Sequence, residues 1–179
     1  MSREEVAWFR QELLRLHLDV QSQLKAWRRV TSRLWEHYFK DRGTREAAAP
    51  LELGVENGTH HLLVAVTDIE KIAAALASRM TNVALRRQLE LAMAKYKKDA
   101  GQARNFRNFY EHADEYIQGK GRLSGRTMWP LGVQVSIGKA GVAYKAEGKK
   151  GNPPLILEPD AAASAALQLA REALQVTGR

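Results

Sequence analysis

The start of the chain carries apolar side chains at the spacing of one face of an α-helix. Charged residues fill the positions between them, and the pattern ends near Lys40-Asp41-Arg42-Gly43. A helix of this length can bury its apolar face only against other long elements. The pattern therefore predicts a mainly α bundle of long helices. The apolar positions are Val6, Phe9, Leu13, Leu16, Val20, Leu24, Trp27, Leu34 and Tyr38.

The second segment begins with residues that usually interrupt helices. Pro50, Gly54 and the pair Asn57-Gly58 predict that residues 44–58 form a loop. Thr59 then stands where an N-cap is expected, ahead of a second helix. The predicted buried face of that helix comprises Leu62, Val66, Ile69, Ala73, Leu76 and Met80.

A third helical pattern starts near Asn82 and stops at Gly119-Lys120-Gly121. Gly101 lies inside it, so the pattern fits either one helix or two helices that meet at this glycine. The predicted apolar stripe comprises Leu85, Leu89, Met93, Tyr96, Ala100, Ala103, Phe106, Tyr110, Ala113 and Ile117.

The last third of the chain has a different pattern. Apolar residues alternate on either side of Gly138-Lys139-Ala140-Gly141, which predicts a β-hairpin. Pro153-Pro154 interrupts the chain again, and Asp160 is the expected N-cap of a short, alanine-rich final helix ending near Val176. The 179 residues favour a single domain, residues 1–179. Within it, residues 1–120 are expected to form the helical core and residues 121–179 an appendage.

Charge and composition narrow the classes of function. A formal net charge of +8 suits a polyanionic partner, although an ordinary basic surface explains it equally well. The chain has no cysteine, which excludes disulfides, thiolate metal sites and cysteine nucleophiles. The N-terminus is polar and no apolar run is long enough to span a bilayer. We therefore expect a cytoplasmic protein with no membrane partner.

The late part of the third helical pattern concentrates polar side chains of three kinds. Arginine can hold a phosphate, asparagine can orient a hydroxyl, and histidine can exchange a proton near neutral pH. This combination within about three helical turns makes the run a candidate active site. The residues are Arg104, Asn105, Arg107, Asn108, Glu111, His112, Asp114 and Glu115.

Helical geometry selects one pair within this run. Asn108 and His112 are four residues apart and share a face of the helix. Arg107 lies about 140° from His112 on an ideal helix, whereas Arg104 lies about 80° away but roughly 12 Å along the axis. The spacing therefore favours the Asn108–His112 pair and leaves the choice of arginine open.

Two interpretations of the run remain open on spacing alone. In the first, a histidine takes the proton of a ribose 2′-hydroxyl or gives one to the leaving 5′-oxygen, while an arginine stabilises the charge on the phosphorane-like transition state. Such a reaction needs no metal or cofactor, and none is expected. In the second, the same side chains lie on a solvated helix face and pair locally with Glu111, Asp114 and Glu115.

The string Arg107-Asn108-Phe109-Tyr110-Glu111-His112-Ala113-Asp114-Glu115 closely resembles the signature of HEPN-domain proteins. In that family the signature is often Arg-Asn-x-x-x-His with acidic residues just after it. The resemblance is specific over about ten residues and architectural over residues 1–120. The predicted β-hairpin and final helix lie outside the part that resembles the family.

This resemblance implies an all-α bundle of the HEPN type that forms a homodimer, with the two motifs at or near the dimer cleft. It implies a metal-independent endoribonuclease that acts as a toxin or as a defence or stress effector, with an antitoxin protein as a further expected partner. Carried over, Arg107 would stabilise the phosphate, Asn108 would be the polar residue beside it, and His112 would be the acid and base. Some members of the family are inactive and only bind RNA, a nucleotide or a protein partner, and a plain dimerisation scaffold is a third reading.

Basic residues flank the motif on both sides. They are either a solvated helix face or an electrostatic funnel for the backbone of RNA, the expected substrate. The residues expected to contact RNA are Lys97, Lys98, Arg104, Asn105, Glu111, Lys120 and Arg122.

Overall fold

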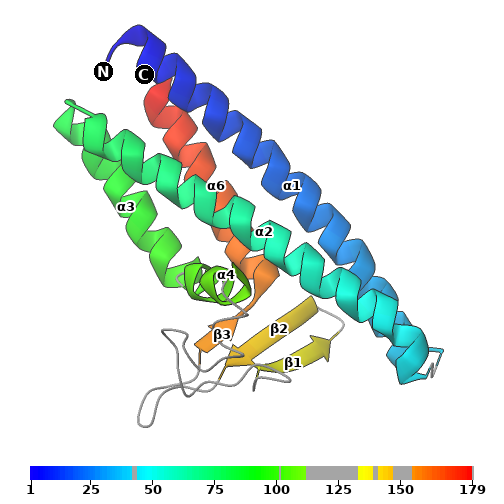
Figure 1. Ribbon diagram of the computed structural model, residues 1–179. Helices are drawn as coiled ribbons and strands as arrows, with labels where there is room; N and C mark the ends of the chain where they lie inside the picture. Colours follow the sequence, from blue (N-terminus) through cyan, green and yellow to red (C-terminus); the bar gives the residue numbers. More distant parts are fainter. Residues whose placement is uncertain (42–43, 101, 112–132, 139–140, 147–154, 179) are drawn as a thin grey trace.

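The fold is mainly α, as predicted. The computed structural model describes residues 1–41, 44–100, 102–111, 133–138, 141–146 and 155–178 (Figure 1). The helices are α1 (Arg3–Phe39), α2 (Arg45–Arg79), α3 (Val83–Ala100), α4 (Ala103–Glu111) and α6 (Pro159–Thr177). The strands are β1 (Val133–Gly138), β2 (Gly141–Ala146) and β3 (Leu155–Leu157).

Helix α1 confirms the prediction from the apolar pattern. Its start is fixed by a capping box, in which the Ser2 hydroxyl accepts from the Glu5 backbone N–H at 3.1 Å and the Glu5 carboxylate accepts from the Ser2 N–H at 2.8 Å. The helix ends at Phe39, with Lys40 as its C-cap. Its buried residues are Phe9, Leu13, Leu16, Val20, Leu24, Trp27, Thr31 and Leu34.

Helix α2 shows that the predicted loop over residues 44–58 is wrong. The helix begins after Thr44, whose side chain accepts from the Ala47 N–H, and runs through Pro50 to Arg79. Pro50 removes only one backbone hydrogen bond near the N-terminal end of the helix, which the packing of the long helix against α1 can offset. Local breaker signals are overridden here by tertiary packing.

Two glycines in this segment face α1, and one of them lies in a tight contact. A Cβ atom at Gly54 would lie 3.1 Å from Cγ1 of Val30, whereas one at Gly58 would lie 3.4 Å from Cδ1 of Trp27, an ordinary contact distance. At Gly54, glycine therefore lets α2 approach the side chain of Val30 closely, instead of ending the helix.

Thr59 is a buried residue in the middle of α2, so its predicted role as an N-cap is also wrong. Its hydroxyl donates to the Val55 carbonyl at 2.8 Å and accepts from the indole N–H of Trp27 at 2.9 Å. This hydrogen bond joins α1 to α2 inside the core. The predicted apolar face of the helix is confirmed, because Leu62, Val66, Ile69, Ala73, Leu76 and Met80 are buried.

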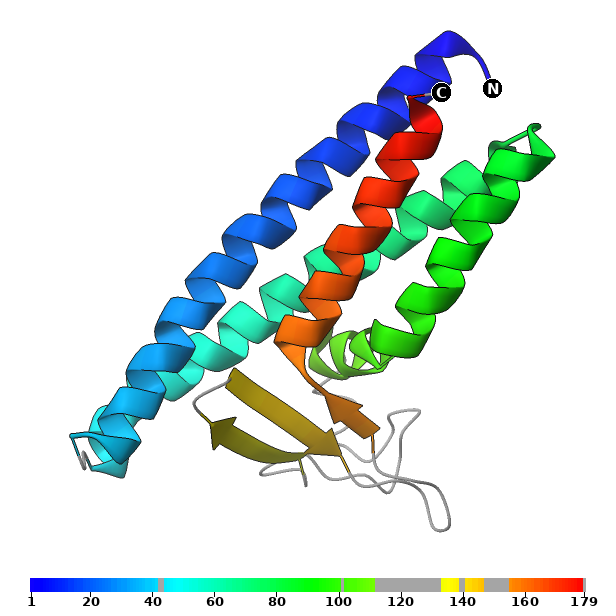
Figure 2. The same ribbon diagram turned by 180° about the vertical axis from the view of Figure 1, so that it is seen from behind.

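The third helical pattern forms two helices, α3 and α4, on either side of position 101. This is one of the two arrangements that the sequence allowed. The side chain of Asn82 caps α3 by accepting from the N–H groups of Ala84 and Leu85 at 3.0 and 3.1 Å. Helix α4 leaves the axis of α3 and packs against α2 (Figures 1 and 2). Within the described part of the predicted stripe, Leu89, Tyr96, Ala100, Ala103 and Phe106 are buried, and Leu85 and Met93 are partly buried.

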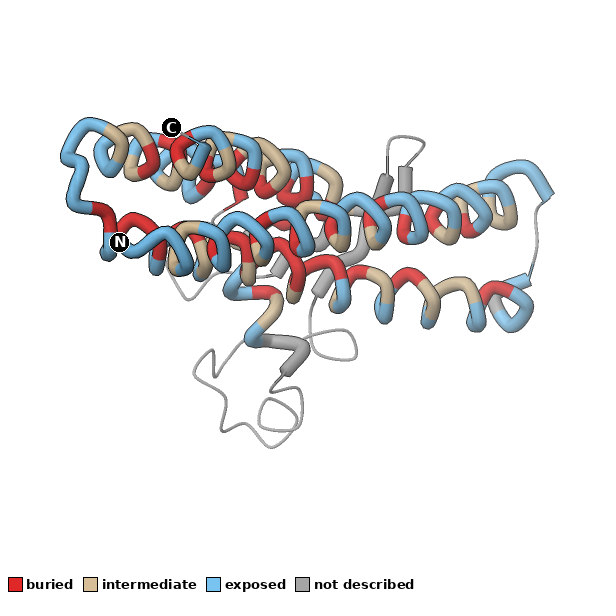
Figure 3. Tube along the Cα trace, turned by 90° about the horizontal axis from the view of Figure 1, so that it is seen from above, coloured by how far each residue is buried: buried red, intermediate tan, exposed pale blue. Residues whose placement is uncertain are grey.

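Helix α6 belongs to the core, so the final helix is not the appendage that the sequence predicted it to be part of. It packs against α1, α2 and α3 and completes a four-helix arrangement with them (Figures 1 and 2). Alanines on its inner face let the neighbouring helices come close, and the pale outer faces in Figure 3 show that burial is confined to the inside. The buried residues of α6 are Pro159, Ala162, Ala163, Ala166, Leu169, Ala170, Ala173 and Val176.

The start of α6 also differs from expectation. Its N-cap is Glu158, with Pro159 at the first helical position, so Asp160 is not the cap. Proline suits this position because its ring presets the helical φ and its missing N–H would have had no helical partner. The Asp160 carboxylate instead accepts from Nε of Arg28 on α1 at 2.8 Å.

The predicted β-hairpin is confirmed. Strands β1 and β2 are antiparallel, with Val133 opposite Ala146 and Gly138 opposite Gly141. Strand β3, which the sequence did not predict, adds to β2 with Leu157 opposite Tyr144. The sheet lies at the end of the bundle where α6 begins (Figure 1), and buried Leu157 connects it to the core.

Candidate functional site

Helix α4 carries the described part of the candidate site. Two of its side chains, Ala103 and Phe106, are buried, and they hold its inner face against the bundle. The sequence predicts this because both residues belong to the apolar stripe. The helix therefore has a fixed inner face and an outer face that presents Arg104, Asn105 and Asn108 to solvent.

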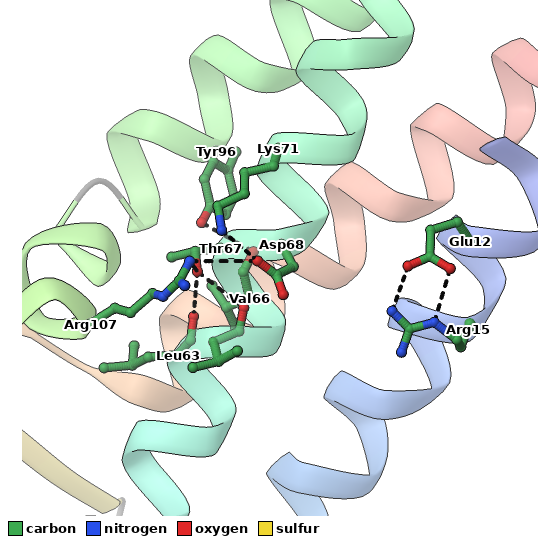
Figure 4. A network of polar contacts seen from close by, with 10 residues as sticks. Glu12, Arg15, Leu63, Val66, Thr67, Asp68, Lys71, Tyr96 and Arg107 are labelled. Carbon is green, nitrogen blue, oxygen red and sulfur yellow. Dashed lines mark hydrogen bonds and ion pairs between the residues drawn. The ribbon is translucent and has the colours of Figure 1, made fainter. Parts of the chain in front are cut away.

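Arg107 lies at the border between these two faces and points toward α2 (Figure 4). Its side chain is only 17% exposed. Nη1 donates to the Thr67 hydroxyl at 3.0 Å and lies 3.5 Å from Oδ1 of Asp68. Among the residues that the structure describes, the arginine is thus held by partners on another helix.

The partners of Arg107 form a connected network on α2. The Thr67 hydroxyl donates to the Leu63 carbonyl at 2.9 Å, and Nζ of Lys71 lies 2.8 Å from the same Asp68 oxygen that faces Arg107. The Asp68 carboxylate therefore lies between two cations (Figure 4). Sequence reasoning missed these residues. The available signal was the polar pair Thr67-Asp68 inside the apolar run of the second helix.

Tyr96 of α3 lies beside this network (Figure 4). Its hydroxyl donates to the Val66 carbonyl at 3.4 Å. Burial, and secondarily the charge of Glu70, raises the pKa of the Tyr96 hydroxyl above its usual value of 10.0. This hydroxyl therefore stays protonated at neutral pH and acts as a hydrogen-bond donor to the bundle.

The two asparagines of the candidate site are both exposed. Asn105 donates from Nδ2 to Oε1 of Gln102 at 2.9 Å, a contact confined to the start of α4. Asn108 lies one residue beyond Arg107, on the solvent side of the helix. An exposed amide at this position is accessible to a ligand that approaches from outside the bundle.

The lysines predicted to contact RNA lie at the end of α3. Lys97 and Lys98 are exposed in its last turn, where positive charge is favoured by the helix dipole. They line a hollow of about 200 Å³ together with Gln102, Leu157 and Glu158. This hollow lies where α3, β3 and the start of α6 meet.

Several predicted site residues lie outside the described residues, namely His112, Lys120 and Arg122. Glu111 is the last residue of α4, and its side chain is also not described. The structure therefore brings Arg107 and Asn108 together on α4 and leaves the Asn108–His112 pair as a prediction.

Other features limit the chemistry that the described residues offer. No three His, Asp or Glu side chains in the described ranges gather closely enough to hold a metal ion. None of the helices in the described part of the chain is both long and apolar enough to cross a membrane.

Comparisons with protein-family models, with curated proteins and with solved structures found no match to this chain.

Proposed function

We propose that this protein is a metal-independent endoribonuclease of the HEPN type, acting as a toxin or as a defence or stress effector. The observation that carries the proposal is the string Arg107-Asn108-x-x-x-His112, whose first two residues share the short helix α4. Support comes from the position of α4, which has a buried inner face and an exposed outer face. The basic charge of the chain suits an RNA substrate.

The proposed reaction is a transesterification within RNA. A neutral His112 takes the proton of a ribose 2′-hydroxyl, whose oxygen attacks the adjacent phosphorus. The bond from phosphorus to the 5′-oxygen breaks, and a protonated histidine gives that oxygen a proton. The products are a 2′,3′-cyclic phosphate and a 5′-hydroxyl. In a homodimer, two copies of His112 supply one base and one acid.

Arg107 has the electrostatic role in this proposal. Its guanidinium can bind two phosphate oxygens at once, so it stabilises the charge that builds up in the transition state. Asn108, exposed beside it, would orient the 2′-hydroxyl or the phosphate.

A second candidate function is favoured by the contacts of Arg107. Because its guanidinium is engaged by Thr67 and Asp68, the arginine also fits a purely architectural role that fastens α4 to α2. The protein would then be a catalytically silent module that binds RNA, a nucleotide or a protein partner through exposed basic residues. It predicts RNA binding that weakens with salt, without cleavage.

The test is to incubate the purified protein with a labelled structured RNA in EDTA. Wild type should cleave it to products ending in a 2′,3′-cyclic phosphate, and His112→Ala should not. His61→Ala removes an exposed histidine from α2 and should cleave like wild type. Equal cleavage by wild type and His112→Ala would overturn the assignment. Absence of cleavage by wild type, with salt-sensitive retention of the RNA, would establish the binding module instead.

A further inference from the structure

The outer side of α1 carries a concentrated patch of positive charge in the middle of the helix. Within nine residues it presents Lys25, Arg28, Arg29 and Arg33, all exposed. Together with Gln21 and Ser32 they line an open groove between α1 and α6, whose α6 wall includes Leu167. Of the described residues that line this groove, the charged ones are all basic.

These four cations differ in their contacts. Arg28 is held by Asp160 at the start of α6, with Nη2 2.6 Å from Oδ1, which ties the groove wall to α1. Among the residues that the structure describes, Lys25, Arg29 and Arg33 have no hydrogen-bond or ion-pair partner. By contrast, Arg15 on this helix and Lys40 at its C-cap are paired with Glu12 and Glu36. The middle of α1 therefore holds three charges that no described residue pairs.

The surroundings of the patch indicate which kind of polyanion it fits. A helix that lies on a membrane needs large apolar side chains beside its basic ones. Along α1, which the structure describes throughout, Leu18 and Phe39 are exposed and no large apolar side chain between them is. The patch instead combines arginine and lysine with the hydroxyl of Ser32 and the amide of Gln21. These groups all donate hydrogen bonds to phosphate oxygens.

The dimensions of the patch also fit a nucleic-acid strand. Lys25 and Arg33 are eight residues apart, which is about 12 Å along the helix axis at 1.5 Å per residue. A patch of this length lets neighbouring cations contact successive phosphates of one strand.

We propose that the groove between α1 and α6 binds the sugar–phosphate backbone of a nucleic acid, with Lys25, Arg29 and Arg33 as the phosphate contacts. This surface is separate from Arg107, since α4 packs on α2, whereas the groove lies between α1 and α6. It would hold a strand through charge and without reading its sequence. The inference rests on the proposed function in one respect, the choice of RNA as the first ligand.

The test measures the binding of a fluorescent 2′-O-methyl RNA strand, which cannot be cleaved by attack of a 2′-hydroxyl, and of a DNA strand of the same sequence. The variant is Arg29→Gln with Arg33→Gln, which removes two exposed charges and keeps a good helix former. The matched control is Arg3→Gln with Arg10→Gln, which removes two exposed charges from the first part of the same helix. Circular dichroism and melting temperature establish that both variants fold.

We expect the Arg29/Arg33 variant to bind RNA roughly tenfold more weakly than wild type. The slope of log K against log salt should fall by about 1.4, since each single-strand phosphate contact contributes about 0.7. The Arg3/Arg10 control should stay within about twofold of wild type. Equal losses in the two variants would overturn the proposal, because net charge alone would then explain binding. Binding to anionic lipid vesicles but to neither strand would also overturn it.

The same samples separate this inference from the proposed function. Loss of binding in the Arg29/Arg33 variant without any cleavage of ordinary RNA by wild type would support the groove and contradict the nuclease. Cleavage by wild type with no effect of the Arg29/Arg33 change on binding would support the nuclease and contradict the groove. A DNA strand that binds as tightly as RNA is expected for a surface that contacts only the backbone. A strong preference for one strand would contradict backbone-only recognition.

Discussion

Arg107 on α4 forms an ion pair with Asp68 on α2, with Nη1 3.5 Å from Oδ1. This separation exceeds the about 2.7–2.9 Å of a strong charge-assisted hydrogen bond. A phosphate oxygen that approaches more closely can therefore compete with the carboxylate for the same guanidinium. The pair positions the arginine on α4 and still permits an exchange of partners, which makes its chemistry testable by conservative substitution.

Substitution of Arg107 by lysine should separate a catalytic role from an architectural one. Lysine keeps the charge that faces Asp68 but lacks the planar fork that binds two phosphate oxygens. We expect Arg107→Lys to lower the rate of RNA cleavage by about 10²–10³, with little change in melting temperature. Single-turnover rates and thermal melts provide the measurements. Arg104→Lys, on the exposed side of α4, is the control and should lose less than about tenfold. If Arg107→Lys cleaved RNA at the wild-type rate, the role of Arg107 would be limited to its structural contact with α2.

Removal of the Thr59 hydroxyl should destabilise the bundle. Thr59→Val leaves the buried indole N–H of Trp27 without its acceptor, and a lost partner of a buried donor costs about 1–3 kcal/mol. Urea denaturation should show a lower free energy of unfolding. Thr59→Ser keeps the hydroxyl and loses only a methyl group, so it should be the milder of the two changes. If both variants lost the same free energy of unfolding, the hydrogen bond would make no measurable contribution to stability.

The two glycines of α2 should respond differently to alanine. At Gly58 an added Cβ would lie 3.4 Å from Trp27, an ordinary contact, so Gly58→Ala should stabilise the protein by about 0.5–1 kcal/mol through helix propensity. At Gly54 the Cβ would lie 3.1 Å from Val30, which forces that side chain to move. We expect Gly54→Ala to melt below Gly58→Ala. The reverse order in calorimetry would show that α1 and α2 are packed less tightly at Val30.

The stability of the protein should fall on mild acidification because of His17. Burial, together with the nearby charge of Arg171, lowers the pKa of the His17 ring below its usual 6.5. The unfolded chain therefore binds a proton more readily than the folded one at pH values between these two pKa values. In that window the free energy of unfolding decreases as the pH falls through about 6.5, and the loss ends below the lowered pKa.

Variants of His17 provide the measurement of this pH dependence. His17→Gln should flatten the curve of unfolding free energy against pH as the pH falls through about 6.5. His61→Gln removes an exposed histidine and should leave the curve as in wild type. An unchanged slope in His17→Gln would assign the dependence to other groups.

Periodicity of apolar residues predicted most of the helical fold, whereas local breaker signals misled. The stripes of α1 and α3 are long and regular, so burial followed directly from spacing. Pro50 and Gly54 suggested a loop because local sequence signals contain no information about α1. In the folded protein, α1 packs closely enough against this segment to hold it in a helix. Helix α6 was predicted in extent but not in position, since an alanine face gives little hydrophobic signal although it packs closely.

The candidate site was predictable only in its local part. That Arg107 and Asn108 share a helix follows from their adjacency, and the burial of Phe106 follows from the stripe. The contact of Arg107 with Thr67 and Asp68 joins residues that are distant in the sequence, and helical geometry within one segment contains no information about it. The basic patch around Arg29 was missed because the sequence does not show which charged side chains lack a described partner in the folded protein.

The central position of α6 has a consequence for the order in which this protein acquires its structure. During synthesis, α1, α2 and α3 leave the ribosome well before α6 exists, yet their inner faces are covered by its alanines. Until α6 is made, those faces are only partly buried. The contacts that complete the core join residues that are far apart in the sequence. Such non-local closure slows folding and lengthens the period in which apolar surface is open to chaperones or to aggregation.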